Sequence, residues 1–204
     1  MTLAVMTRLL AMVLLSGGLV AGCAPRPDAD AMRPVSPVAG AKHVTFHVVT
    51  NRQAMAGNWP GDQAGRASRM DHMRVTVSVP PGHAVGAVEW SRDQPGPAHS
   101  FAVLARDELS ATAFRREIAT GPGRDSVLVF VHGYNTSLPD GVFRLAQILH
   151  DSNATGAAVL FSWPSQARIS GYGADREAAL FARDDLADFL AALADDPRLG
   201  QIVV

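Results

Sequence analysis

The residues best suited to chemistry follow one apolar run of this 204-residue chain. Residues 127–131 are continuously apolar, and His132, Gly133, Tyr134 and Asn135 come directly after them. A buried strand that delivers a His-Gly pair into a loop can aim a backbone N–H at an oxygen that gains negative charge during acyl transfer. The plainer alternative is that His132 and Gly133 merely end a strand, because glycine is a common turn residue.

The other histidines give no metal site at a recognisable spacing. His43 and His47 fall on one face of an expected strand, but four residues of strand hold them roughly 13 Å apart, too far to share one zinc ion. The remaining histidines have no partner at ligand spacing; they are His72, His83, His99 and His150. We expect these side chains to be hydrogen-bonded or exposed to solvent, and we expect no metal and no cofactor.

The elements that must position the His-Gly loop lie in the second half of the chain. Apolar runs at 127–131, 157–161 and 202–204 predict buried strands. Between them, residues 138–150 and about 175–194 carry apolar side chains at helical spacing. This alternation predicts an α/β fold, in which a parallel sheet is flanked by helices on both faces and the crossovers are right-handed.

Acidic residues stand near the starts of both expected helices. Pro139 and Asp140 suit the first turn of the earlier helix, where a missing donor and a negative charge are tolerated. Asp175 stands where the long helix is expected to begin. We therefore interpret Asp175 as an N-cap rather than as a catalytic acid.

The first half of the chain has the pattern of a strand-rich section. Residues 43–49 and 73–79 alternate apolar with polar side chains and are rich in β-branched residues, as expected of strands. Residues 84–90 and 101–105 are shorter apolar runs on either side of a turn-rich stretch at 91–98. We expect these segments to form a small antiparallel section before the parallel strands.

The N-terminal residues predict export and a lipid anchor. Residues 1–22 contain Arg8 and then an uncharged apolar stretch that ends in small residues, the pattern of a signal peptide. Cys23 follows Val-Ala-Gly and resembles the lipobox of bacterial lipoproteins, in which the cysteine is acylated and becomes the first residue. An ordinary signal peptide with an incidental cysteine is the alternative. Ala24, in place of an aspartate, favours the periplasmic side of the outer membrane over the inner membrane.

Composition limits the remaining possibilities. Residues 23–41 are rich in proline and poor in large apolar side chains, so we expect a tether that leads to one domain at 42–204. Cys23 is the sole cysteine, so once it is acylated no disulfide can form. With 18 Lys plus Arg against 19 Asp plus Glu, the chain has no basic field to bind nucleic acid.

Several segments together resemble a known family. Residues 127–135, 161–165 and 172–175 are similar, in this order, to the bacterial alpha/beta hydrolases of unknown function. The resemblance runs from about residue 44 to the end, and its earlier part lies in residues 50–52, 77–80 and 83. It implies the alpha/beta-hydrolase fold, preceded here by the strand-rich section.

The resemblance also implies roles for the loop residues. In this fold the loop after the third strand supplies one backbone donor to a tetrahedral oxyanion. The donor would be Tyr134; Gly133 would allow a tight turn and a close approach of substrate, and His132 and Asn135 would brace the loop by hydrogen bonds. The implied activity is that of a lipid-anchored serine hydrolase acting on an ester, thioester or amide.

Two aromatic residues are candidates for the substrate pocket. Ligands of open α/β sheets bind beyond the carboxyl ends of the strands, where Trp163 is expected, and Tyr172 follows nearby. Packing inside the fold is an equally good interpretation of both residues.

The nucleophile that this activity needs does not occur in the chain. The family places Gly-x-Ser-x-Gly after the fifth strand, which would fall beyond Val204, and the pattern is absent from the 204 residues. We expect the chain to be truncated before its nucleophile and to be inactive by itself. A non-catalytic envelope lipoprotein that uses the scaffold for binding is the alternative. We also expect residues 202–204 to form an exposed apolar edge that makes the protein poorly soluble.

Overall fold

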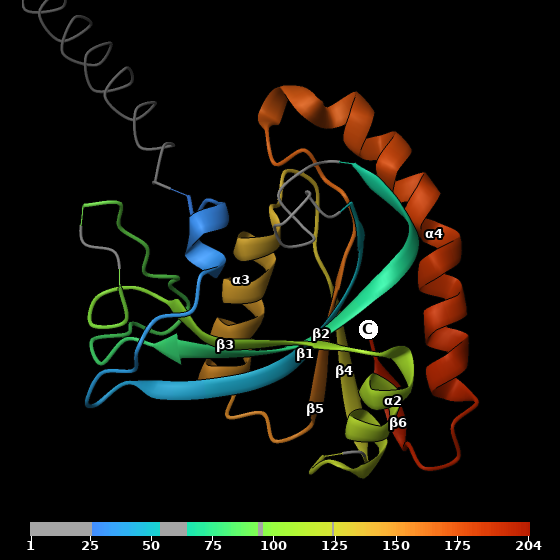
Figure 1. Cartoon of the computed structure of the whole chain (residues 1–204), viewed down its shortest axis with the longest axis horizontal. Coiled ribbons are helices and arrows are strands. Elements are labelled where there is room, and N and C mark those ends of the chain that lie inside the picture. The colour runs from blue at the N-terminus through green and yellow to red at the C-terminus, as the bar shows by residue number, and fades with distance from the viewer. Residues whose placement is uncertain (1–25, 54–64, 94–95, 124) are drawn as a thin grey trace, which may run out of the picture.

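The computed structural model describes residues 26–53, 65–93, 96–123 and 125–204. The strands of this described part form one mixed sheet in the order β3-β2-β1-β5-β4-β6 (Figure 1). Helices cover both faces of the sheet. The predicted α/β class is therefore confirmed, although the sheet is mixed rather than wholly parallel.

The strand-rich N-terminal section is an antiparallel meander. It consists of β1 (Lys42–Arg52), β2 (Arg66–Val79) and β3 (Ala102–Leu109). The predicted strand over 84–90 is wrong, because these residues form a turn at 85–86 and have no regular secondary structure elsewhere. Glycine at Gly86 has φ of 85°, a left-handed conformation that interrupts a strand.

The second half of the chain supplies the parallel part of the sheet. Its strands are β4 (Ser126–Val131), β5 (Ala157–Ser162) and β6 (Gln201–Val203). β4 lies between β5 and β6 and is parallel to both, while β5 also pairs in parallel with β1. The meander thus extends the same sheet, and β4 occupies a central place in the α/β part.

Three α-helices of the described residues flank this sheet. α3 (Leu138–Asp151) begins as predicted, with a capping box in which the Ser137 hydroxyl and the Asp140 carboxylate each accept a backbone N–H of the other residue. α4 (Tyr172–Ala194) starts three residues earlier than predicted. Sequence reasoning missed α2 (Ala111–Thr120), although Ser110 before it is a standard N-cap residue.

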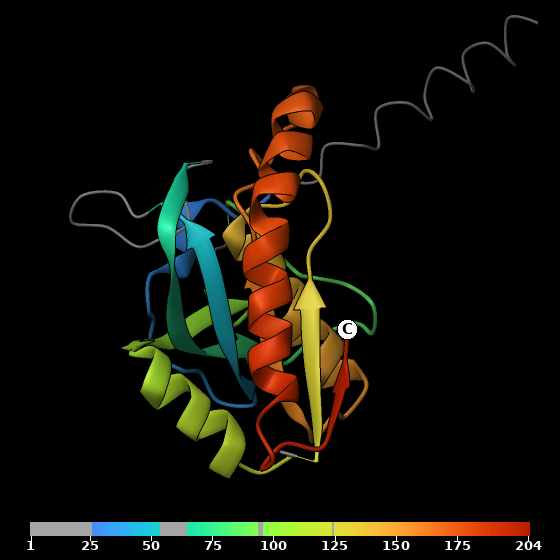
Figure 2. The same cartoon turned by 90° about the vertical axis from the view of Figure 1, so that its right-hand side faces the viewer.

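The two faces of the sheet have separate cores, because neighbouring residues of a strand point to opposite sides. In β1, Val48 joins the apolar cluster that contains Phe143 of α3. Val49 joins the cluster that contains Phe114 of α2 and Phe189 of α4. Figures 1 and 2 show α3 on one side of the sheet and α4 on the other.

The described part of the predicted tether packs on the domain. Residues 26–41 include the short 3-10 helix η1 (Ala29–Met32), in which Met32 is 3% exposed and belongs to the core on the α3 side. Arg26 forms an ion pair with Asp140 at the start of α3. One large apolar side chain and one charge therefore hold a segment whose composition predicted a free linker.

The predicted signal peptide and Cys23 lie outside the described residues. Among the helices that the structure describes, none is both long and apolar enough to cross a membrane.

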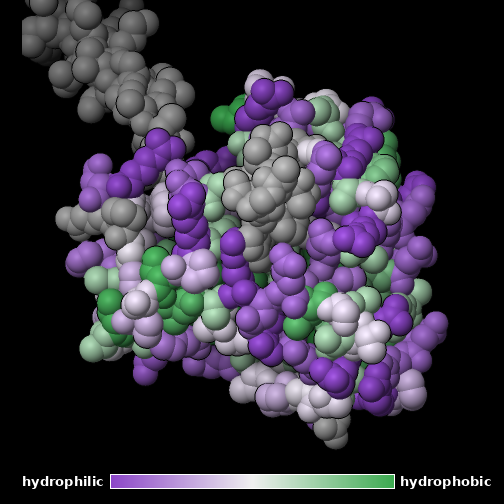
Figure 3. Space-filling model, in the orientation of Figure 1, coloured by the Kyte–Doolittle hydropathy of each residue, from purple (hydrophilic) through white to green (hydrophobic). Residues whose placement is uncertain are grey.

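β6 is the outermost strand on its side of the described sheet (Figure 2). Val203 is 40% exposed there, in keeping with the expected apolar edge, while poor solubility stays a prediction. On the face seen in Figure 3, hydrophilic residues predominate and hydrophobic ones gather in small separate groups.

Candidate active site

The loop between β4 and α3 lies where the strand order reverses. From β4 the chain passes through α3 to β5 on one side, and then through α4 to β6 on the other side of β4. Because α3 and α4 cover opposite faces, the carboxyl end of β4 is a topological switch point, the usual place for a ligand in an open α/β sheet. His132, Gly133, Tyr134 and Asn135 begin the loop at this point, as the sequence predicted.

His132 is a buried anchor of the loop. Its ring is stacked on Trp163 with centroids 4.9 Å apart, and the Trp163 indole N–H donates to the His132 carbonyl oxygen over 2.8 Å. The ring nitrogens face the carbonyl oxygens of Gly133 at 2.9 Å and of Trp163 at 3.0 Å. A neutral imidazole has one N–H, so it donates to one of these two carbonyls at a time.

The charge state of His132 follows from its surroundings. Burial lowers its pKa to about 4, and the nearby Arg52 guanidinium acts in the same direction. The ring is therefore neutral at pH 7. A general base needs a pKa near the working pH and access to substrate, and His132 offers neither.

Side chains take up the backbone N–H groups of the loop one after another. The N–H of Asn135 donates to Asp175 Oδ2 over 3.1 Å, and the N–H of Thr136 donates to Ser165 Oγ over 3.1 Å. The N–H of Ser137 donates to Asp140 Oδ2 over 3.0 Å within the capping box. Among the described residues, the N–H of Tyr134 has no hydrogen-bond partner. The loop thus leaves the N–H of Tyr134 available directly before three amides that side chains hold in place.

Asp175 is the main clamp, and its predicted role as an N-cap is wrong. It lies inside the first turn of α4, where Gly171 precedes the helix, and it is 2% exposed. Besides Asn135, its carboxylate accepts the Ser165 hydroxyl over 2.6 Å and the Gln166 N–H over 2.6 Å. Donors in two loops need a hydrogen-bond acceptor at this place, and Asp175 serves them instead of capping the helix.

Arg52, the last residue of β1, connects that strand to the two loops that contain Thr136 and Ser165 by hydrogen bonds. Its fully buried guanidinium donates to Ser162 Oγ over 3.0 Å, to the Ser165 carbonyl over 3.0 Å and to the Thr136 carbonyl over 2.9 Å. A planar, forked donor can serve several acceptors at once in a fixed geometry. The sequence analysis gave Arg52 no role, because a position at the end of a strand does not show which loops the side chain will contact in the folded protein.

The tight turn falls on Asn135 rather than on Gly133. Asn135 has φ of 57°, a left-handed conformation that asparagine tolerates better than most residues. Gly133 has no positive φ, and a Cβ placed on it would meet no atom within 4 Å. The predicted turn at Gly133 is therefore wrong, and the glycine instead leaves open space beside the Tyr134 amide.

A pocket of about 420 Å³ lies beside this loop. Gly133 and His132 line it together with Arg144 of α3 and Arg26 of the N-terminal segment. The Arg26 guanidinium also donates to the Asn135 carbonyl and, over 2.9 Å, to its side-chain oxygen. The N-terminal segment thus contributes a wall that sequence reasoning did not foresee.

The two predicted pocket aromatics lie outside the lining of this pocket. Trp163 is 7% exposed and packs in the core on the α4 side, which is the packing alternative. Tyr172 is 64% exposed, and its ring meets that of Tyr134 edge to face with centroids 5.4 Å apart. The Tyr134 hydroxyl donates to the Ile169 carbonyl oxygen, which fixes the side chain against the segment before α4.

The serine, histidine and aspartate of the site do not form a catalytic triad. Ser165 is 2% exposed and donates straight to Asp175, while its oxygen accepts the N–H groups of Thr136 and Ala167. His132 contacts Arg52 instead of Ser165. A buried hydroxyl that makes three hydrogen bonds is a structural group and not a nucleophile.

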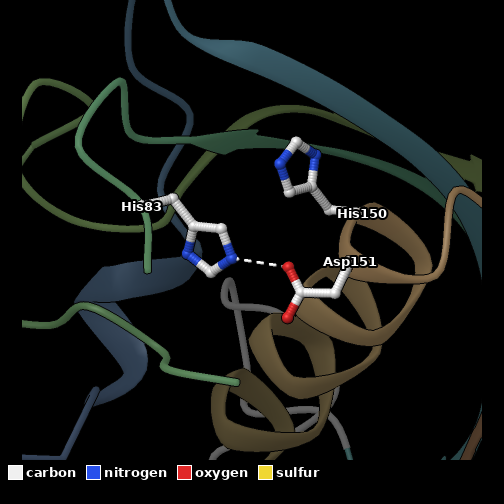
Figure 4. Close-up of side chains that lie close together, drawn as sticks. All are labelled: His83, His150 and Asp151. Atoms are coloured by element: carbon white, nitrogen blue, oxygen red, sulfur yellow. Dashed lines mark hydrogen bonds and ion pairs between the residues drawn. The ribbon is translucent and has the colours of Figure 1, made fainter. Parts of the chain in front are cut away.

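The histidines outside the loop include one cluster that sequence reasoning missed. His83, His150 and Asp151 lie close together (Figure 4), with one possible ligand atom of each within 4.8 Å of the others. His83 is hydrogen-bonded, as expected of these histidines, but the sequence spacing did not indicate that His150 and Asp151 lie beside it. His47 is also hydrogen-bonded, because its Nε2 lies 3.0 Å from Glu117 Oε2 in a half-buried pair.

The comparison with known families supports the assignment of this half of the chain. The family model described as alpha/beta hydrolase of unknown function (DUF900) matches residues 107–204, just under half of the chain, and this range contains the loop, Ser165 and Asp175. The match supports an alpha/beta hydrolase family, consistent with the fold. Neither the curated proteins nor the solved structures gave a match. Before residue 107 the resemblance stays a prediction.

Proposed function

We propose that the loop after β4 is the oxyanion-binding half of a hydrolase site for an ester, thioester or amide. The observation that supports this most directly is the N–H of Tyr134 at the switch point, which has no partner among the described residues and directly precedes two amides that Asp175 and Ser165 hold in place. A donor fixed before the reaction needs no reorganisation when charge develops, and such a donor is worth on the order of 3 kcal/mol in the barrier.

The chemistry needs a serine that lies next to this donor. Its oxygen attacks the carbonyl carbon while a general base takes the hydroxyl proton, the carbonyl electron pair moves onto oxygen, and the Tyr134 N–H stabilises that charge. The base then gives the proton to the leaving group, so the scheme needs a base as well as a serine. Collapse of the intermediate breaks the bond to the leaving group, and water then releases the acyl group. No cofactor takes part in this scheme.

The 204 residues do not contain the Gly-x-Ser-x-Gly pattern that presents such a serine. We therefore propose that this chain alone forms no acyl-enzyme. β6 pairs in parallel with β4, with Val203 beside Leu128, so a chain that continued from β6 in the same direction would approach the carboxyl end of β4, where the loop begins.

The alternative is a non-catalytic envelope protein that uses the hydrolase scaffold for binding. The burial of Ser165 favours it, because this serine contacts the loop but is inaccessible to substrate. In that case the pocket beside Gly133 binds a ligand without chemistry.

For both candidates we propose attachment to the periplasmic face of a membrane, in particular the outer membrane, through a lipid on Cys23. Replacing Cys23→Ser should abolish incorporation of labelled palmitate and move the protein from the detergent phase to the aqueous phase on phase separation. Unchanged palmitate labelling of the variant would contradict the anchor.

A fluorophosphonate probe, which reacts with activated serines, tests the hydrolase proposal. We expect no labelling of the 204-residue chain, and labelling of a product that the same gene yields when it is read past Val204, in frame or after one shift, into a Gly-x-Ser-x-Gly pattern. Strong labelling of the 204-residue chain would contradict the proposed site, and a gene without that pattern would favour the binding alternative.

Matched variants of the longer product test the donor itself. Tyr134→Pro removes the N–H, and we expect it to slow labelling roughly 100-fold or more. Tyr134→Ala keeps the N–H and removes the side chain, so labelling should change by only a few fold. Equal effects of the two variants would contradict a role for the amide.

A further inference from the structure

A second polar cluster joins the loop after β2 to the far end of α3. His83 lies in that loop, with its side chain 6% exposed, and its two ring nitrogens face carboxylates on opposite sides. Nδ1 lies 2.8 Å from Glu89 Oε2, and Nε2 lies 2.7 Å from Asp151 Oδ1. His150 stands beside them, with its ring centroid 5.2 Å from that of His83 (Figure 4).

Further hydrogen bonds fix the orientation of both carboxylates of this cluster. The other oxygen of Glu89 accepts the Ala84 N–H over 2.8 Å. The other oxygen of Asp151 accepts the Gly86 N–H over 2.7 Å and the Gln147 side-chain amide over 2.6 Å. Each carboxylate therefore keeps one oxygen fixed toward His83, while backbone and amide donors use the second.

We propose that His83, His150 and Asp151 bind a divalent transition cation of the zinc class. Two imidazoles and one carboxylate are ligands that zinc accepts, and a water molecule would complete a four-coordinate site. Glu89 would then act on the metal through His83, because a carboxylate that accepts the Nδ1–H fixes the tautomer in which Nε2 carries the lone pair.

The distances between the three possible ligand atoms suit such a site after small movements of the side chains. Bonds of about 2.1 Å place two tetrahedral ligand atoms roughly 3.4 Å apart. His83 Nε2 and Asp151 Oδ1 are already closer than this, at 2.7 Å, and would separate slightly as the metal enters between them. His150 lies farther out, within the 4.8 Å limit of the cluster, and would rotate inward.

The position of the cluster indicates what the cation would do. Asp151 ends α3, whereas the candidate active site lies beside the first turn of that helix, about 20 Å away at 1.5 Å per residue. The cation would therefore fasten the loop containing His83 to α3, at a distance from the candidate active site.

Zinc titration of the purified chain, freed of metal by a chelator, tests this proposal. We expect one zinc ion per chain by calorimetry and a rise in the thermal unfolding midpoint on addition of zinc. His150→Ala removes one ligand, and no hydrogen bond holds its side chain among the described residues, so the variant should fold and bind zinc at least 10-fold more weakly. His99→Ala, which removes an exposed histidine outside the cluster, is the matched control and should bind zinc as the unchanged chain does.

A second variant separates ligand loss from a general loss of stability. Asp151→Asn keeps the shape of the side chain but weakens it as a ligand, and we expect weaker zinc binding together with a smaller thermal shift. Absence of binding at one zinc ion per chain, or equal binding by His150→Ala and His99→Ala, would overturn the proposal.

Discussion

His132 and His83 both have little-exposed side chains, but their surroundings shift their pKa values in opposite directions. His132 has carbonyl oxygens and the Arg52 guanidinium around it, and burial lowers its pKa to about 4. Burial also lowers the pKa of His83, but hydrogen bonds and charges from Glu89 and Asp151 outweigh that effect and raise it. The neighbouring Asp151 has a pKa lowered to about 2, chiefly by the Gly86 N–H.

The two histidines therefore belong to different kinds of site: His132 supports the candidate active-site loop, and His83 joins the loop after β2 to α3. At the β4 loop the His132 ring is neutral and side chains hold the amides of Asn135 and Thr136, and we propose that the Tyr134 N–H serves a developing negative charge. Around His83 the charges are paired with each other, and the surplus of carboxylates suits a cation. Both arrangements join distant segments, but only the first lies at a switch point of the sheet.

The largest expected effect comes from the clamp on the β4 loop. Asp175→Ala leaves three buried donors without their acceptor, those of Asn135, Ser165 and Gln166. At about 1–3 kcal/mol for each unsatisfied group, some of which water will satisfy, we expect a loss of about 4 kcal/mol in the free energy of unfolding. Urea denaturation measures it. Asp184→Ala, an exposed aspartate of the same helix, should change that free energy by less than about 0.5 kcal/mol.

The next effect is a pH dependence that only His132 should produce at this loop. Its pKa is about 4 in the folded chain against 6.5 when unfolded, so below pH 6.5 the unfolded chain takes up a proton that the folded chain does not. The stabilisation is complete above pH 6.5 and is lost as the pH falls toward 4, by about 3 kcal/mol at most. Urea denaturation across this range should therefore show a shallower slope for His132→Gln than for the unchanged chain. Identical slopes would contradict a neutral, buried ring.

A smaller effect is expected where the N-terminal segment meets the loop. Arg26 is 43% exposed at its side chain and pairs with Asp140, which is more enclosed. Arg26→Ala should cost roughly 0.5–1 kcal/mol in the free energy of unfolding, and the cost should shrink in high salt because the pair is partly solvated. A cost that does not change with salt would mean that Arg26 acts by packing alone.

The smallest effect should be that of Gly133→Ala. The glycine has an ordinary φ, and a Cβ there meets open space, so the free energy of unfolding should change by less than about 0.5 kcal/mol. In a product with an active serine, the added methyl group should still slow fluorophosphonate labelling, because it occupies the space beside the Tyr134 amide. A large loss of stability would show that the loop needs glycine for folding rather than for access.

The sequence predicted those parts of the fold that depend on local pattern. The continuous apolar runs of β4 and β5 and the capped start of α3 could be read directly, because burial on both faces and helix capping leave local signatures. The loop at His132 was found for the same reason, since it follows the apolar run of β4. α2 was missed although Ser110 and the spacing of Phe114 and Ile118 carry its signal.

The remaining site residues could not be predicted, because their roles depend on contacts between distant segments. Asp175 was interpreted as a cap, although it accepts the N–H of Asn135, forty residues earlier. His83 and Asp151 are 68 residues apart, and no spacing rule connects them. Proline content made residues 26–41 resemble a tether, yet Met32 finds a place in the core.

The central claim is that the β4 loop leaves the Tyr134 N–H available while side chains hold the amides that follow it, and native-state amide hydrogen exchange measured by NMR tests it most directly. We predict that the N–H of Tyr134 exchanges quickly, while the N–H groups of Asn135 and Thr136 are protected by Asp175 and Ser165. Protection of Tyr134 equal to that of its neighbours would mean that its N–H already has a partner, and it would contradict the account.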